Sequence, residues 1–161
     1  MLKRRGIVTG ASRGIGAAIA IELDRRGYEV YGLSRSGRSS AGTGIVCDMT
    51  DEGVVRDTFG RITDDGPVTV LVNNAGFHVS ARSSSLSVAD YTAVMALNAT
   101  AVMVACREIY PSMKDGGGGM IVNIGSFFDK LGVPGNLAYC SSKAAVGAMT
   151  RCLAVEWAGV G

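Results

Sequence analysis

Short apolar runs alternate with helical patterns along the chain, and this alternation restricts the fold more than any other feature. Apolar runs suited to strands occupy residues 7–9, 28–34, 45–47, 68–72 and 120–124. Helical patterns occupy residues 14–26, 51–63, 88–113 and 139–157. This order predicts an α/β fold, a Rossmann-like doubly wound parallel sheet with right-handed crossovers and helices on both faces.

Two of the helical patterns carry an apolar stripe. In the first, Ile15, Ile19 and Leu23 recur at intervals of four residues. The same interval marks the last helix, at Ala145, Met149, Leu153 and Trp157. Because residues four apart lie on one side of a helix, each stripe predicts a face buried against the sheet or a neighbouring helix.

A glycine-rich turn, Thr9-Gly10-Ala11-Ser12-Arg13-Gly14-Ile15-Gly16, joins the first strand to the first helix. Glycines let a ligand approach the backbone closely, and a helix N-terminus offers free N–H groups and a partial positive charge to a pyrophosphate. The spacing is Gly-x3-Gly-x-Gly, which differs from the commoner dinucleotide fingerprint. Taken alone, the turn is compatible with a dinucleotide site or with a turn that binds nothing.

Charge and length argue against several classes of protein. The 161 residues fit one domain, 47% of them are hydrophobic, and the formal net charge is +2. No basic stripe suits nucleic acid or a membrane surface. Lys3-Arg4-Arg5 resembles the start of a signal peptide, but the apolar segment of about 7 to 15 residues that such a peptide needs does not follow. We also expect no run that approaches the length of a membrane span.

The chain has one histidine and four cysteines, and they suggest no metal site. No Cys-x-x-Cys pair or His/Cys cluster occurs. The cysteines are Cys47, Cys106, Cys140 and Cys152. We therefore expect free thiols and a reducing, cytoplasmic location. His78 lies in a polar loop and is expected to be a surface residue.

Polar clusters follow four of the predicted strands. They are residues 9–16, Ser34-Arg35, residues 73–76 and Ser126. Ligands of open parallel sheets bind beyond the carboxyl ends of the strands. The clusters therefore predict one ligand site at that edge.

Taken together, these motifs resemble those of the short-chain dehydrogenase/reductase family. In chain order they are Thr9-Gly10-x3-Gly14-x-Gly16, Asp48, Asn73-Asn74-Ala75-Gly76, Asn98, Ser126 and Tyr139-x3-Lys143. The resemblance covers the whole chain and implies one NAD(P)-binding Rossmann-like domain over residues 1–161, with strand order 3-2-1-4-5. The glycine turn is typical of the 3-oxoacyl-acyl-carrier-protein reductases within the family.

Tyr139 and Lys143 lie four residues apart on a predicted helix, so their side chains can meet. They could be an ordinary helix pair, with the tyrosine packed and the lysine in water. The alternative, which the other motifs favour, is that Lys143 stabilises the tyrosinate. A free phenol titrates near 10, so ionising it near neutral pH takes about 4 kcal/mol of preferential stabilisation. Tyr139 would then act as general acid in reduction and general base in oxidation.

Two further residues are assigned to catalysis by the resemblance. Ser126 would orient the substrate oxygen, although it could equally be a helix-cap or turn serine. Asn98 would hold a water that relays protons to Lys143, although it could equally be a satisfied core asparagine. Lys143 would also contact the nicotinamide ribose.

The second strand ends in Ser34-Arg35, where NAD-binding proteins usually place an acid for the ribose 2′-hydroxyl. Arg35 with Arg13, helped by Arg38, can instead bind a 2′-phosphate, which predicts NADP(H) over NAD(H). The resemblance assigns the cofactor contacts to Gly10, Ser12, Arg13, Gly14, Ile15, Gly16, Arg35, Asp48, Met49, Asn74, Ala75, Gly76, Tyr139 and Lys143. Asp48 would contact the adenine edge, unless it caps the next helix.

Family chains normally continue past the equivalent of Trp157 with further strands and a substrate-covering segment. We therefore expect an incomplete domain, either a fragment or a chain whose open strand at 120–124 is covered by partners. A homodimer or homotetramer through helices 88–113 and 139–157 is implied. The predicted partner is a small carbonyl or alcohol substrate, not nucleic acid or a membrane. The alternative function is an NADP(H)-binding module without turnover.

Overall fold

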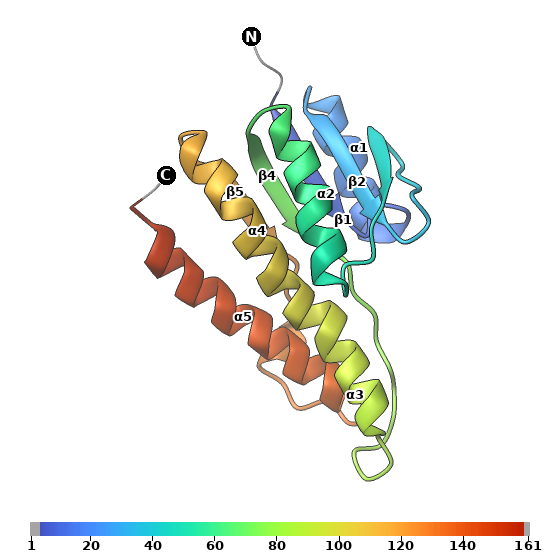
Figure 1. Ribbon diagram of the computed structural model, residues 1–161. Coiled ribbons are helices and arrows are strands. Elements are labelled where there is room, and N and C mark those ends of the chain that lie inside the picture. Colours follow the sequence, from blue (N-terminus) through green and yellow to red (C-terminus); the bar gives the residue numbers. More distant parts are fainter. Residues whose placement is uncertain (1–3, 160–161) are drawn as a thin grey trace.

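The computed structural model describes residues 4–159, and its centre is a five-stranded parallel sheet (Figure 1). The strands lie in the order β3-β2-β1-β4-β5, which confirms the predicted order. Their bounds are Arg5–Thr9 for β1, Glu29–Ser34 for β2, Thr43–Val46 for β3, Val68–Asn73 for β4 and Met120–Asn123 for β5. All four pairings are parallel, so every strand ends at the same edge of the sheet.

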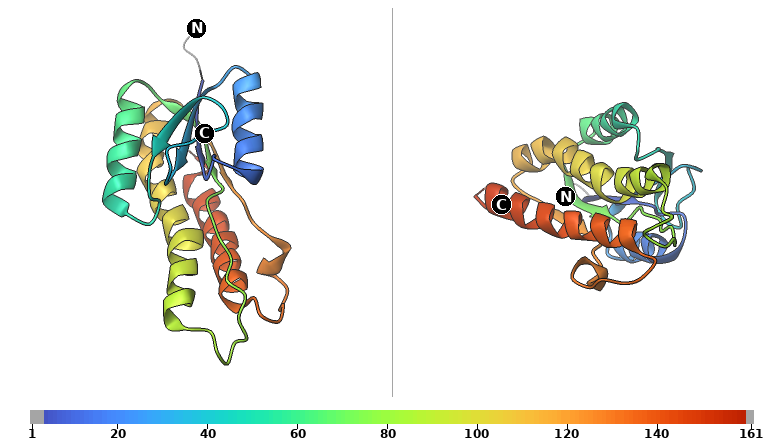
Figure 2. Two further views of the ribbon diagram at one scale, coloured as in Figure 1. Left: turned by 90° about the vertical axis from the view of Figure 1, so that its right-hand side faces the viewer. Right: turned by 90° about the horizontal axis from the view of Figure 1, so that it is seen from below.

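Helices cover both faces of the sheet, as predicted (Figure 2). Helix α1 (Gly14–Arg25) lies on one face, and α2 (Glu52–Asp64) and α4 (Ala101–Asp115) lie on the other. Helix α5 (Leu137–Trp157) runs beside α4. Asp51 precedes α2 and caps it, because its side chain accepts a hydrogen bond from the Val54 N–H.

The sequence predicts one helix over residues 88–113, and the structure divides this rod into three parts. Helix α3 (Val88–Met95) passes through a π-helical turn, η1 (Ala96–Thr100), into α4. Along the whole rod, four apolar residues of the predicted helix are buried: Val94, Val102, Ile109 and Met113.

This rod contradicts the expectation that no run approaches the length of a membrane span. By length and composition, Val88–Asp115 is apolar enough to cross a membrane, with a mean hydropathy of 1.4 in its most apolar stretch. A core helix of a soluble protein passes the same test. Here α4 packs against β4 and α2.

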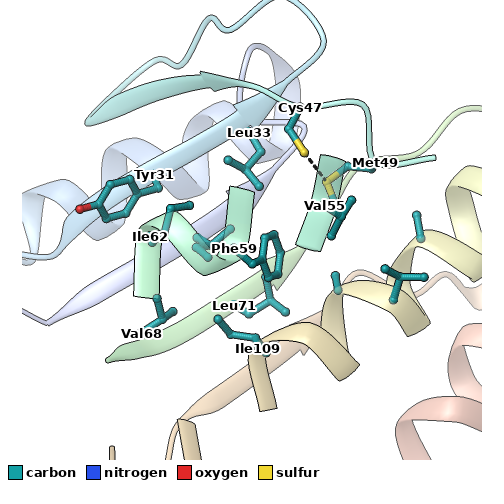
Figure 3. Close-up of a cluster of buried hydrophobic side chains, with 14 of the residues drawn as sticks. Tyr31, Leu33, Cys47, Met49, Val55, Phe59, Ile62, Val68, Leu71 and Ile109 are labelled. Atoms are coloured by element: carbon teal, nitrogen blue, oxygen red, sulfur yellow. Dashed lines mark hydrogen bonds between the residues drawn. The ribbon is translucent and has the colours of Figure 1, made fainter. Parts of the chain in front are cut away.

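Two apolar layers, one on each face of the sheet, form the core. The layer under α2 and α4 contains Leu33, Phe59, Leu71 and Ile109 (Figure 3). The layer under α1 contains Val8, Ala20, Val30 and Val72. The inner strands β1, β2 and β4 are therefore covered on both faces, which explains their continuous apolar composition.

The predicted apolar face of α1 is wrong at its first position. Ile15 is 62% exposed, and the buried residues of α1 are Gly16 and Ala20. Ile19 and Leu23 do pack against the core. The helix approaches the sheet through Gly16, so the preceding Ile15 projects outward at the mouth of the glycine turn.

Among the described residues, β5 is the last strand on one side of the sheet and pairs with β4 alone, so its other side is open. A hollow of about 230 Å³ lies beside it, lined by Ile121, Leu153 and Trp157 among others. The open edge is as predicted.

Of the N-terminal basic cluster, Lys3 lies outside the described residues, while Arg5 pairs with Glu29 at 2.9 Å.

Candidate cofactor and catalytic site

The glycine turn has a backbone shape that side chains would prevent. Gly10 and Gly14 have φ of 69° and 59°, the left-handed region that favours glycine. A Cβ on Gly16 would lie 2.4 Å from the Gly10 carbonyl oxygen, so α1 can approach the turn only at a glycine. These contacts fold the turn into a compact cradle at the start of α1.

The N-terminus of α1 is suited to a phosphate group. Arg13 stands at the N-cap position without a side-chain cap, and the first turn carries no acidic residue. Arg13, Gly14 and Ile15 are exposed, and Ser12 is half-buried. Free N–H groups and the helix dipole therefore face a cradle that a bulky side chain does not fill, which fits a dinucleotide pyrophosphate.

A second loop, residues 73–76, is bound to the glycine turn by Thr9. The Thr9 hydroxyl oxygen accepts hydrogen bonds from the backbone N–H groups of Asn74 and Ala75, both at 3.0 Å. The Asn74 side-chain amide in turn donates to the Thr9 carbonyl oxygen at 2.9 Å. The sequence predicts Asn74 as a site residue and includes Thr9 in the glycine-turn motif without giving it a role. In the structure the Thr9 hydroxyl joins the two loops.

Three arginines lie around the ends of β1 and β2. Arg13, Arg35 and Arg38 are exposed, and none forms an ion pair among the described residues. Ser34, at the end of β2, is buried and donates its hydroxyl to the Arg38 carbonyl oxygen at 2.9 Å. No acid occupies this position, so the charge here is positive.

Asp48 and Met49 differ in what they can offer a ligand. Asp48 is exposed, and hydrogen bonds from the backbone and side chain of Thr50 hold the pKa of its carboxyl below the usual range. It does not cap α2, a role that Asp51 takes. The Met49 side chain is buried and contacts the Cys47 thiol at 3.8 Å (Figure 3). A cofactor could therefore meet only the Met49 backbone.

The structure brings Tyr139 and Lys143 together on the first turns of α5. Lys143 is 6% exposed, and its Nζ donates to the Ile124 carbonyl oxygen at 2.7 Å. The same nitrogen lies 5.7 Å from the centre of the Tyr139 ring. Burial lowers the pKa of the Lys143 ammonium because it removes water from the charge. The ordinary alternative, a lysine in water, is therefore wrong.

Ser126 follows β5 and begins a short turn that contacts the same tyrosine through Phe128. Its hydroxyl oxygen accepts a hydrogen bond from the Phe128 N–H at 3.2 Å, which caps the short 3-10 helix η2 (Phe127–Asp129). The Phe128 ring meets the Tyr139 ring edge to face, with centres 5.8 Å apart. Ser126 is therefore a turn serine, as one of the two interpretations held. Its hydroxyl hydrogen is not used in this bond and stays available to a substrate oxygen.

Asn98 is buried within η1 and connects three segments. Its side chain accepts from the Phe77 N–H at 3.0 Å and donates to the Phe77 carbonyl at 2.9 Å and to the Ser142 hydroxyl at 3.2 Å. Gly76 approaches so closely that an added Cβ would lie 3.0 Å from the Asn98 side-chain oxygen. Asn98 therefore binds the 73–76 loop to α5, and its side chain is fully engaged in doing so.

His78 is exposed, as expected, but it is not isolated. Its ring lies edge to face against Tyr139, with centres 5.5 Å apart, and its Nε2 lies 2.5 Å from the Asn136 side-chain oxygen. His78 and Tyr139 are 61 positions apart in the sequence, so no local pattern could predict the contact.

Comparison with known proteins agrees with this geometry. Residues 5–161 match the family model described as short chain dehydrogenase. The chain is 32% identical to D-threitol dehydrogenase of Mycolicibacterium smegmatis, covering 96% of this chain and 65% of that protein. It is 33% identical to the 3-oxoacyl-acyl-carrier-protein reductase of Haemophilus influenzae, covering 96% and 68%.

A solved structure matches as well. The gluconate 5-dehydrogenase of Burkholderia cenocepacia, in complex with NADP and tartrate, superposes with a TM-score of 0.91 at 28% identity. The match covers 99% of this chain and 68% of that one. The chain thus spans about two thirds of the length of the proteins it matches.

Proposed function

This chain belongs to the short-chain dehydrogenase family, and from that premise we propose that it transfers a hydride between NADP(H) and a carbonyl or secondary alcohol, with Tyr139 as the general acid and base. The observation that carries the proposal is the group formed by Tyr139, the buried Lys143 and the loop that begins at Ser126. These residues meet at the strand edge that also carries the glycine turn.

The proposed chemistry divides between cofactor and chain. The nicotinamide supplies the hydride for reduction and accepts it in oxidation. In reduction, the Tyr139 hydroxyl gives its proton to the substrate oxygen while Ser126 orients that oxygen by a hydrogen bond. The Lys143 ammonium, held by the Ile124 carbonyl, stabilises the developing phenolate. Asn98 positions the loop beneath the substrate.

The proposal is tested by NADPH oxidation against a panel of ketones, hydroxyketones and β-ketoesters. We expect turnover by the wild-type chain and a loss of at least about a hundredfold in Tyr139→Phe, with NADPH binding retained. Phenylalanine keeps the ring contacts with His78 and Phe128, so only the hydroxyl is removed. Equal turnover by the two chains would contradict the role of Tyr139.

NADP(H) is the proposed cofactor because positive charge surrounds the place where an NAD-binding protein usually has an acid. Arg35 and Arg13 are exposed and free of ion pairs among the described residues, so both can meet a 2′-phosphate. The related gluconate 5-dehydrogenase is an NADP complex, and we propose the same preference here.

Fluorescence titration with the two reduced cofactors tests the preference. The wild-type chain should bind NADPH at least about tenfold more tightly than NADH, and Arg35→Ser should reduce that ratio. Arg56→Ser, at an exposed position of α2, is the matched control. Equal affinities for the two cofactors in the wild-type chain would refute the preference.

The second candidate is a module that binds NADP(H) without turnover. The same ketone panel separates the two functions, since a binding module retains cofactor affinity and oxidises no NADPH. A cytoplasmic location and a place among the 3-oxoacyl-acyl-carrier-protein reductases stay predictions.

A further inference from the structure

His78 is held in one orientation from two sides. On the loop that carries it, both backbone groups of the preceding Phe77 are bound by the Asn98 side chain. Three residues later, the Ala81 N–H donates to the Gly135 carbonyl at 3.1 Å. The imidazole then contacts Asn136 and the Tyr139 ring, which belong to the other wall of the site.

Asn136 determines which ring nitrogen of His78 carries the proton. The Asn136 amide nitrogen donates to the Pro134 carbonyl oxygen at 2.9 Å. A carbonyl can only accept, so the amide must present its oxygen to His78, and an oxygen there requires an N–H on Nε2. The neutral imidazole consequently keeps a free lone pair on Nδ1, for which no residue between 4 and 159 provides a partner.

An exposed side chain that is held rigidly beside a reactive group is suited to recognition. The imidazole centre lies 5.5 Å from that of the Tyr139 ring, so His78 borders the tyrosine whose hydroxyl we propose to meet the substrate oxygen. A hydroxyl on the adjacent carbon can donate to Nδ1, whereas an alkyl group there gains nothing.

We propose that His78 is a specificity-determining residue that accepts a hydrogen bond from a hydroxyl next to the reacting carbon, so that α-hydroxyketones and vicinal diols are favoured. The inference rests on the proposed function. Asn136 acts as a positioning residue, because it holds the ring through Nε2 and does not contact the substrate.

Two ketones that differ by one hydroxyl provide the kinetic test. We expect the full chain to reduce 1-hydroxy-2-butanone with a kcat/KM about tenfold above that of 2-butanone, the size of one good hydrogen bond. His78→Gln keeps a donor near the Nε2 position, so the contact with Asn136 survives while the Nδ1 acceptor is lost. This variant should reduce both ketones with nearly equal kcat/KM, so the ratio between them falls from about tenfold to about one.

His78→Asn is the complementary variant. Its amide places an acceptor near the Nδ1 position and lacks the Nε2 donor, so it should recover part of the preference. If the His78 variants change the two rates by the same factor, His78 has only a structural role and the inference is overturned.

A second measurement does not depend on turnover. His78 is the only histidine, so ¹⁵N-histidine labelling gives one pair of ring signals. We expect a protonated Nε2 and an unprotonated Nδ1 whose signal moves when 1-hydroxy-2-butanone is added to the Tyr139→Phe chain with NADP⁺. 2-Butanone should leave it in place. A proton on Nδ1, or equal responses to both ketones, would overturn the inference, while absent turnover with the expected signals would count against the proposed function alone.

Discussion

Lys143 is the residue whose charge the fold disfavours most clearly. Its ammonium is almost fully buried and has one hydrogen bond from the chain, to the Ile124 carbonyl. Burial lowers its pKa from the ordinary value of 10.5. A buried cation of this kind is hard to explain by stability alone, and perturbed groups of this type collect at functional sites.

The lowered pKa predicts a stability that depends on pH. Because the unfolded chain holds this proton more tightly, it binds more protons than the folded chain between the folded pKa and about 10.5. The free energy of unfolding should therefore rise with pH through that range. Urea unfolding followed by Trp157 fluorescence measures it at each pH.

The comparison uses two variants. Lys143→Met should lose this rise, whereas Lys114→Met, at an exposed position near the end of α4, should keep it. If the free energies of unfolding of wild type and Lys143→Met change with pH in the same way, the buried Lys143 ammonium is not the cause of the pH dependence.

The π-helical turn η1 is the element that joins the two halves of the site. One extra residue in the turn interrupts the regular helix between α3 and α4 and directs Asn98 at the Phe77 backbone. Single π-turns inside helices occur frequently at functional sites. Here the turn couples the loop after β4 to Ser142 on α5.

Removing the Asn98 side chain should uncouple that loop. Asn98→Ala removes the hydrogen bonds that the buried Asn98 side chain forms with the Phe77 N–H and carbonyl and with the Ser142 hydroxyl, so the free energy of unfolding should fall by about 2–4 kcal/mol. Urea unfolding measures the loss. Thr100→Ala, at an exposed position of the same turn, is the control and should change stability by less than about 0.5 kcal/mol. A loss no larger than that of the control would contradict the role given to Asn98.

In the whole molecule, the β5 side combines an open strand with exposed apolar side chains on the neighbouring helices. The strand has one neighbour, and α4 and α5 leave an apolar hollow beside it. Val155 on α5 is 83% exposed, and Met103 on α4 is 38% exposed. Apolar surface of this kind favours association, which supports the predicted dimer or tetramer through these helices.

Association through α4 and α5 can be measured by sedimentation velocity over a range of concentrations. The wild-type chain should form a dimer or tetramer, and Val155→Lys should weaken it by at least about tenfold. Val46→Lys, on a comparably exposed valine at the β3 edge, should not. A chain that is monomeric at every concentration would refute the predicted assembly.

Apolar periodicity predicted the positions of the strands and helices, because it is local in the chain, whereas the family resemblance implied the strand order and the open edge at β5. Periodicity failed at Ile15, since it does not reveal that α1 approaches the sheet through Gly16. The π-turn was missed because its apolar spacing still resembles a regular helix.

In the candidate site, local motifs identified the residues, whereas their partners came only from the fold. The roles of the Thr9 hydroxyl and of His78 depend on contacts across 58 or more positions. Asn73 also bonds the Asn123 side chain at 2.8 Å across neighbouring strands. Such contacts depend on the register of the sheet, which no single segment encodes.

Transfer of deuterium to a ketone from NADPH that carries deuterium at both C4 positions of the dihydronicotinamide tests the central claim most directly. The account predicts one deuterium on the carbinol carbon of the alcohol formed by the wild-type chain, detected by mass spectrometry, and almost no alcohol from Tyr139→Phe with the same cofactor bound. Unlabelled alcohol, or equal labelled product from both chains, would contradict it.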